Sequence, residues 1–331
     1  MAIFPHRPDH KRKDKQGIEI LWRKSFRIQR RLTSLGKLRK PKAKIWNFMI
    51  NYMLSFFAKH SFLANQRFPK SKDLTIVRLS SEIRAKQIAE YIGGKYNPKD
   101  GYENNTCVYI KPGNVDRIRD TDYVDFSDGL YTGLLEKLKQ RPQIKVLAHS
   151  THLYKYLKDR LPNEIIYLPQ QHLNWERAKR DRKEVTTGGY IGSSSSISIK
   201  LNTEVKEALE KIGMDYVMCY NWRSREDAIN FYKGIDFLVV YGYGNSDKNN
   251  PCAQPTKMIN AASFGIPSFA SWQVGYEEFE DYYMRFKTMD DLVEEVQKLK
   301  DNIYYDKYAE KIIKKAEEYH ISKIAELYKK L

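Results

Sequence analysis

From residue 71 onward, short apolar runs alternate with amphipathic segments of helical length, and this alternation restricts the possible folds more than any other feature. Strands that alternate with helices of about ten residues predict βαβ units, in which a parallel sheet is covered by helices. In the first half, the predicted strands are 73–80, 106–110, 144–150 and 164–169, and the predicted helices are 81–94, 130–140 and 151–161. The charged segment 174–184 then predicts a linker, so the first α/β domain is expected over 71–183.

A second series of the same kind follows and predicts a second α/β domain over 184–305. Its predicted strands are 188–193, 214–220, 236–242 and 266–271, and its predicted helices are 203–213, 224–235, 256–265 and 289–300. Residues 306–331 predict one closing helix. Its apolar positions form a helical stripe, which comprises Tyr308, Ile312, Ile313, Ala316, Tyr319 and Ile324.

The positive charge is concentrated at the N-terminus. Residues 1–70 carry 18 Lys and Arg against 3 Asp and Glu, and so hold +15 of the net charge of +17. Because the remainder is almost neutral, this extension, and not the folded domains, is expected to bind an anionic partner such as phospholipid or nucleic acid.

The apolar segment 43–63 closes this basic extension and predicts an amphipathic helix. Asn47, Asn51, Ser55 and Lys59 recur every four residues and form a narrow polar stripe, which argues against a membrane-spanning helix. One interpretation is a helix lying in a membrane interface, with basic side chains on the headgroups. The other is a helix that packs on the first domain. In the interfacial interpretation, the membrane-binding side chains are Trp46, Phe48, Phe56 and Phe57.

The three cysteines, Cys107, Cys219 and Cys252, are scattered and odd in number. This pattern argues against a disulfide framework, and without a C-x-x-C pair it gives no indication of zinc. The first twenty residues are basic and polar with no apolar run, so no signal peptide is predicted. We therefore expect a cytoplasmic protein, peripheral on the inner face of a membrane.

The clearest candidate for a binding site is the start of the predicted helix 256–265. A buried strand ends near Tyr241, a polar loop follows, and the helix begins with Pro255 and Thr256 in cap positions. Free amides and the helix dipole at such an N-terminus bind phosphate groups, and Lys257 adds a positive charge. An ordinary capped helix that binds nothing is the alternative.

Residues 190–271 resemble the donor-binding domain of GT-B glycosyltransferases. The segment YIGS at 190–193 is similar to the opening strand of that domain, and PTKMINAASFGIPSFAS at 255–271 is similar to the motif of its diphosphate-binding helix. In the second segment, the residues at matching spacings are Lys257, Ala261, Gly265 and Pro267. The resemblance implies two Rossmann-like, doubly wound domains of the GT-B type and a nucleotide-sugar donor bound in the cleft between them. It also implies that the closing helix 306–331 packs back on the first domain.

The resemblance also implies roles for individual residues in donor binding. Gly192, Ser193 and Ser194 would approach the phosphates, with Lys200 as a possible phosphate lysine, and Thr256 and Lys257 would bind the diphosphate. The base pocket would comprise Tyr220, Asn221 and Trp222, while Gly244 and Asn245 would lie near the sugar.

One departure from the family pattern concerns a pair of glutamates separated by seven intervening residues. Many retaining members carry this pair, whereas Cys252 and Asn260 stand at the corresponding positions here. Asn260 can hydrogen-bond a ribose or sugar hydroxyl but cannot act as a carboxylate. Retaining and inverting stereochemistry both remain open.

The first domain contributes weaker candidates. His149 and His152 follow a predicted strand, and His149 is a candidate general base for deprotonating an acceptor hydroxyl. His172 lies where the linker is expected to reach the cleft. A cluster of four aspartates could bind an acceptor or a metal, but its spacing predicts no metal site and favours a solvated loop: Asp120, Asp122, Asp125 and Asp128.

The main hypothesis is a glycosyltransferase that passes a sugar, of hexosyl type, from a nucleotide-sugar to a lipid-linked or polysaccharide acceptor at a membrane surface. It predicts no cofactor and no metal requirement. A second hypothesis is a phage-type glycosyltransferase acting on nucleic acid, with binding that falls steeply with salt. A third is an inactive sugar-nucleotide-binding or scaffold protein, because the glutamate pair is missing.

Overall fold

The computed structural model describes residues 60–64, 82–99, 101–102, 105–112, 115–116, 118–127, 132–192, 199–220, 222, 224–241 and 250–331. The chain divides into two compact units, residues 1–58 and 59–331, and every described residue belongs to the second unit. The predicted membrane contacts Trp46, Phe48, Phe56 and Phe57 and the predicted strand 73–80 lie outside the described residues.

The first domain is built on a parallel sheet with the strand order β2-β1-β3-β4-β5-β6. The strands are β1 (His60–Ala64), β2 (Lys95–Tyr96), β3 (Thr106–Ile110), β4 (Tyr123–Asp125), β5 (Lys145–Ala148) and β6 (Ile165–Tyr167). The described helices are a π-helical segment (Glu82–Gln87) that continues into α4 (Ile88–Ile92), then α5 (Thr132–Lys139) and α6 (Thr151–Lys158). The predicted strands 106–110, 144–150 and 164–169 are confirmed within a residue or two.

The prediction of a helix over 43–63 is wrong at its C-terminal end, because residues 60–63 belong to strand β1. Ser61 pairs with Lys95 of β2 on one side and with Cys107 of β3 on the other, and the Phe62 side chain is fully buried. A short apolar run is compatible with the periodicity of a helix and with that of a strand. Here, pairing with two neighbouring strands selects the strand. The first domain therefore begins before residue 71, and the predicted boundary at residue 70 is wrong.

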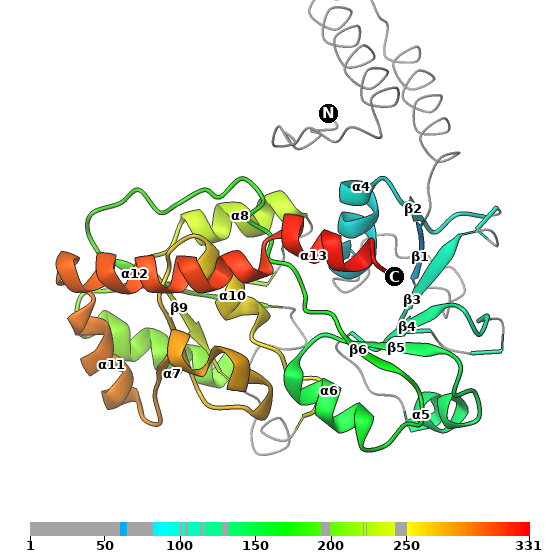
Figure 1. Ribbon diagram of the computed structural model, residues 1–331. Coiled ribbons are helices and arrows are strands. Elements are labelled where there is room, and N and C mark those ends of the chain that lie inside the picture. The colour runs from blue at the N-terminus through cyan, green and yellow to red at the C-terminus, as the bar shows by residue number, and fades with distance from the viewer. Residues whose placement is uncertain are drawn as a thin grey trace, which may run out of the picture. The chain divides into compact units, whose positions relative to one another are not determined.

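The second domain is built on another parallel sheet, with the order β11-β10-β9-β7-β8. Its strands are β7 (Thr187–Ile191), β8 (Asp215–Cys219), β9 (Phe237–Val240), β10 (Ser268–Ala270) and β11 (Met284–Arg285). Its helices are α7 (Ile199–Glu210), α8 (Arg225–Lys233), α10 (Thr256–Ser263), a 3-10 helix (Val274–Tyr282) and α11 (Met289–Lys298). Figure 1 shows the helices of this domain on both faces of its sheet. Together with the parallel sheet of the first domain, this confirms the predicted fold of two Rossmann-like domains.

The C-terminal segment is two helices, α12 (Asn302–Ala316) and α13 (Ile321–Tyr328), and not the single helix predicted for 306–331. A 3-10 turn (Glu317–Tyr319) separates them, and the ring of His320 accepts a hydrogen bond from the Ser322 N–H as the N-cap of α13. Capping side chains favour the start of a new helix.

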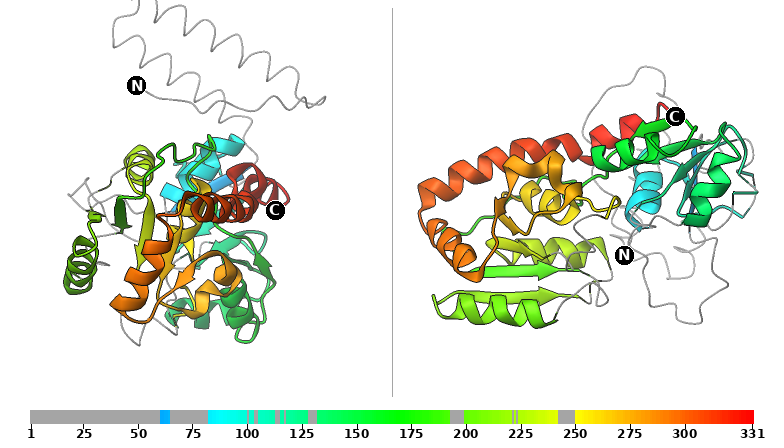
Figure 2. Two further views of the ribbon diagram at one scale, coloured as in Figure 1. Left: turned by 90° about the vertical axis from the view of Figure 1, so that its left-hand side faces the viewer. Right: turned by 90° about the horizontal axis from the view of Figure 1, so that it is seen from below.

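Helices α12 and α13 pack on different domains. Helix α12 packs against α10 and places Ile312 in the core of the second domain, whereas α13 packs against α4. The Tyr328 ring meets the Phe62 ring edge-on, with centroids 5.5 Å apart. The closing segment therefore returns to the first domain only through α13, and the two helices run along both domains in Figure 2.

Within the described part of the chain, none of the helices has the length and apolar character needed to cross a bilayer.

Candidate functional site

A cavity of about 320 Å³ lies between the two domains, where strands from both sheets end. Ser127 follows β4, Gly192 follows β7, and Val240 ends β9, and all three line the cavity. In open α/β sheets, ligands bind at the carboxyl ends of the strands, so the cavity stands where the topology predicts a site.

Helix α10 begins at this cavity, and its N-terminus has no side-chain cap. The N-cap is Pro255, which makes no side-chain hydrogen bond, and Pro255, Thr256 and Lys257 all line the cavity. By contrast, side chains cap the N-termini of five other helices in the described part of the chain, namely Ser150 on α6, Ser224 on α8, Thr288 on α11, Asp301 on α12 and His320 on α13. The open N–H groups and the dipole of α10 favour an anion in the cavity.

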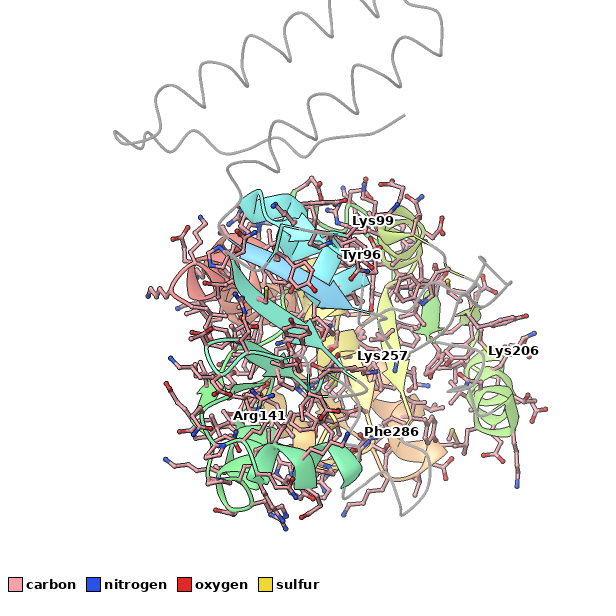
Figure 3. The ribbon with its side chains drawn as sticks, turned by 90° about the vertical axis from the view of Figure 1, so that its right-hand side faces the viewer. Tyr96, Lys99, Arg141, Lys206, Lys257 and Phe286 are labelled. Carbon is pink, nitrogen blue, oxygen red and sulfur yellow. The ribbon has the colours of Figure 1, made fainter. Side chains whose placement is uncertain are left out.

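Lys257 supplies a positive charge at the same place and is labelled on α10 in Figure 3. Its Nζ lies 5.6 Å from the centre of the Tyr190 ring, and no carboxylate of the described residues pairs with it. Burial lowers the pKa of Lys257 because the charged form loses hydration. An anionic ligand would restore the favoured charged form.

Gly192 packs closely against the Tyr190 ring. A Cβ at this position would lie 2.8 Å from the Tyr190 hydroxyl, so a larger residue would push Tyr190 out of place beside Lys257. The Gly192 N–H donates to the Cys219 carbonyl at 3.0 Å, so this amide is already committed to the sheet. The absence of a side chain at Gly192 therefore allows close approach, but its N–H is not a free donor.

The remaining predicted donor contacts fall into three groups. Trp222 and Thr256 line the cavity, as does Asn260. Lys200 and Tyr220 are not among the lining residues; the Lys200 side chain is 87% exposed and lies 3.9 Å from Glu204. The other predicted contacts lie outside the described residues: Ser193, Ser194, Asn221, Gly244 and Asn245.

Several residues that line the cavity were not predicted from the sequence. Arg225, on α8, donates from Nε to the Leu173 carbonyl at 2.8 Å, and its guanidinium lies 4.1 Å from the centre of the Trp175 ring. Gln170 and Gln254 also line the cavity and approach each other at 3.4 Å across the interdomain boundary. The only sequence signal was the expectation that the linker reaches the cleft near His172.

The two candidate histidines are buried and do not line the cavity. Desolvation, followed by the positive charge of Arg84, lowers the pKa of His149 to about 3, and desolvation and the neighbouring His320 lower that of His172 to about 3. Both rings are therefore neutral at neutral pH and are weak bases. His172 packs edge-on against His320, with ring centroids 5.4 Å apart, and accepts the Asn174 N–H at Nδ1. This places His172 in the packing beneath the linker.

The prediction that the acidic cluster forms a solvated loop is wrong for its two central members. Asp125 pairs with Arg84 at 2.6 Å, and both side chains are fully buried. Asp122 is buried as well and pairs with Arg119 at 2.7 Å, whereas Asp120 is exposed. Asp128 lies outside the described residues. Among the described residues, no group of three or more His, Cys, Asp or Glu side chains could hold a metal ion.

A carboxylate also bridges the domains near the cavity. Oε2 of Glu278 accepts hydrogen bonds from the Thr151 N–H at 3.2 Å and from the Tyr167 hydroxyl at 3.1 Å. Desolvation raises the pKa of Glu278. Tyr276, two residues earlier on the same 3-10 helix, lines the cavity, so the bridge lies close to it along the chain.

No protein-family model matches the sequence, and no curated protein matches it. Solved structures do match. WaaG, a glycosyltransferase involved in lipopolysaccharide biosynthesis, has a TM-score of 0.51 over 81% of this chain and 99% of its own, at 11% identity. TarM has a TM-score of 0.50 over 68% of this chain, at 10% identity, and this chain covers 54% of TarM, about half its length. The fold is that of the GT-B glycosyltransferases, as the resemblance in the sequence implied.

The described lining of the cavity is basic on one side and uncharged on the other. Lys257, Arg225 and the α10 N-terminus belong to the second domain, whereas the first domain contributes Ile83, Gln87 and Ser127. None of the described lining residues is an Asp or Glu. The described wall can therefore hold a diphosphate and polar hydroxyl groups, but it offers no carboxylate as a general base.

Proposed function

We propose that the protein is a glycosyltransferase that binds a nucleotide-sugar in the interdomain cavity, with the diphosphate at the N-terminus of α10. The observation that carries the proposal is the uncapped start of α10, which opens together with Lys257 into a cavity at the strand ends of both sheets. The GT-B fold, found here with low sequence identity, supports the same reaction class.

A thermal-shift screen against UDP, GDP, CDP and ADP and their glucose conjugates tests donor binding. A ligand at a hundredfold excess over its Kd should stabilise the folded protein by about 2.7 kcal/mol. Release of the nucleoside diphosphate from the conjugate that binds best then tests catalysis. Binding without any release would support the inactive sugar-nucleotide-binding protein, and no stabilisation by any of the eight compounds would refute the proposal.

For the acceptor, we propose a lipid-linked or polysaccharide glycan at the inner face of a membrane in the cytoplasm. The support is the charge distribution, because residues 1–70 hold +15 of the +17 net charge. Sedimentation with anionic vesicles and a DNA gel shift, each across a salt series, separate this acceptor from nucleic acid. Purely electrostatic binding to DNA falls steeply with salt, whereas apolar insertion persists.

The proposal includes neither a resident metal nor another cofactor. This part of the proposal is supported by Lys257 and the dipole of α10, which supply positive charge for the diphosphate. Donor turnover should therefore be unchanged in excess EDTA, and loss of turnover that returns with a divalent cation would contradict this part of the proposal.

A further inference from the structure

Ser127 has an unusual backbone conformation at the wall of the cavity. It follows β4 with a φ of 52°, in the left-handed region, and it is buried while lining the cavity. A non-glycine residue keeps this conformation only where the surrounding structure determines it, and such residues gather at binding sites.

A buried ion pair holds Ser127 in place. Oδ1 of Asp125 accepts the Ser127 N–H at 2.7 Å, and Oδ2 of Asp125 accepts from Arg84 Nε at 2.6 Å. Nη2 of Arg84 donates to the Leu168 carbonyl at 3.1 Å, which ties the pair to the residue that follows β6. Buried ion pairs contribute little net stability, so fixing a local conformation is the better explanation of this one.

The Ser127 hydroxyl has no hydrogen-bond partner among the described residues, although it is buried. Leaving a buried hydroxyl unpaired is unfavourable, and in a wall that faces a cavity a ligand can supply the missing partner. The neighbouring lining groups of the first domain are the Ile83 side chain and the Gln87 amide, which carry no charge. The positive groups, Lys257 and Arg225, belong to the other domain.

We propose that Ser127 is a specificity-determining residue whose hydroxyl hydrogen-bonds a carbohydrate hydroxyl of the ligand in this cavity. The inference rests on the proposed function, because it assigns the diphosphate to the α10 side and the sugar to the Ser127 side. The sugar hydroxyl can belong to the donor or to the acceptor, and the chemistry of recognition is the same in both cases.

Calorimetric titration of the full chain tests the assignment with two variants, Ser127→Ala and Ser127→Gly. Both remove the hydroxyl, but glycine also favours the left-handed backbone, so a shared effect reports the hydroxyl and not strain. The matched control is Ser268→Ala in β10, because Ser268 is also buried with an unpaired hydroxyl but does not line the cavity.

The titrants are the nucleoside diphosphate that binds best, its glucose conjugate, and octyl glucoside added to protein saturated with the diphosphate. Both Ser127 variants should keep the affinity for the diphosphate. Loss of roughly threefold to tenfold in affinity for the conjugate assigns Ser127 to the donor sugar, and the same loss for octyl glucoside alone assigns it to the acceptor. Unchanged affinities in both arms would overturn the inference while the proposed function stands. A wild-type protein that binds no nucleoside diphosphate would overturn both.

Discussion

The side-chain carbonyl oxygen of Asn260 accepts a hydrogen bond from the backbone N–H of Leu173 at 2.9 Å. Asn260 lies on α10 in the second domain, and Leu173 lies in the segment that joins the domains. Both residues line the cavity, so the binding wall and the linker are one hydrogen-bonded unit. The expected bond from Asn260 to a sugar hydroxyl remains a prediction, but its carbonyl oxygen already has a structural partner.

Replacing Asn260 by alanine should destabilise the fold by about 1–3 kcal/mol, because the Leu173 N–H is left without its acceptor. Urea unfolding measures the change. The control is Asn302→Ala, because Asn302 is exposed and its loss should change stability by less than about 0.5 kcal/mol. Equal stability of the two variants would show that the Asn260 bond contributes nothing.

Replacing Lys257 by methionine should weaken binding of the nucleoside diphosphate and leave the fold intact. Methionine keeps an apolar stem against Tyr190 but removes the charge, and a charge-assisted phosphate contact is worth about 1.5–3 kcal/mol, roughly tenfold to a hundredfold in affinity. Calorimetric titration measures this. Lys206→Met, on the exposed face of α7, is the control, and identical Kd values for both variants would remove Lys257 from the site.

The sequence was sufficient where structure is locally determined. The strand and helix alternation of the second domain is confirmed because caps such as Ser224 and Thr288 and the buried apolar runs specify it within a few residues. The sequence was insufficient where contacts between distant segments determine the structure. Strand β1 depends on pairing with β2 and β3, and nothing near Arg84 indicates a buried partner 41 residues away at Asp125.

The residues of the candidate site likewise fall into those with a local sequence signal and those without one. Lys257, Thr256 and Gly192 were predicted because a helix start and a strand end carry local signals, and all three line the cavity. Ser127 and Arg225 were missed because only the approach of the two domains brings them together. His149 was a candidate general base, but it is buried and does not line the cavity, and that burial depends on packing that no short motif encodes.

Stability should fall in mild acid because two histidines are buried in the neutral form. The pKa of His149 and of His172 is lowered to about 3, whereas an unfolded histidine titrates near 6.5. Below about pH 6.5 the unfolded chain therefore binds protons that the folded chain does not, and stability is lost as pH falls toward 3. Each histidine contributes a slope of up to about 1.4 kcal/mol per pH unit.

Urea unfolding at several pH values checks this, with His149→Asn compared with the wild type. Between about pH 6 and pH 5 the variant should lose roughly 1 kcal/mol less stability than the wild type, because one titrating group is absent. Measurement at pH 8, where the ring is neutral in both states, separates this effect from lost packing. Parallel curves over the whole range would contradict the assignment.

Removing residues 1–58 should leave a folded protein, whereas removing residues 1–63 should not. The longer deletion takes away most of β1, which lies between two strands and carries the fully buried Phe62. Truncating a buried Phe to alanine alone costs about 3–5 kcal/mol, a large share of the roughly 5–15 kcal/mol that stabilises a domain. Circular dichroism and thermal unfolding show whether each truncated protein folds. Equal melting temperatures would show that β1 is dispensable.

The shorter truncation also tests the proposed membrane attachment, because residues 59–331 retain the whole described unit and lose most of the basic charge. Each basic residue near an anionic surface contributes on the order of 1 kcal/mol, so the full chain should sediment with anionic vesicles and residues 59–331 should not. Salt should weaken attachment of the full chain without abolishing it if the apolar segment also inserts. Nucleoside diphosphate binding by residues 59–331 should match that of the full chain, which separates loss of attachment from loss of folding. Vesicle binding that survives the truncation would place the membrane contact on the folded domains, and a full chain that ignores anionic vesicles would end the membrane hypothesis.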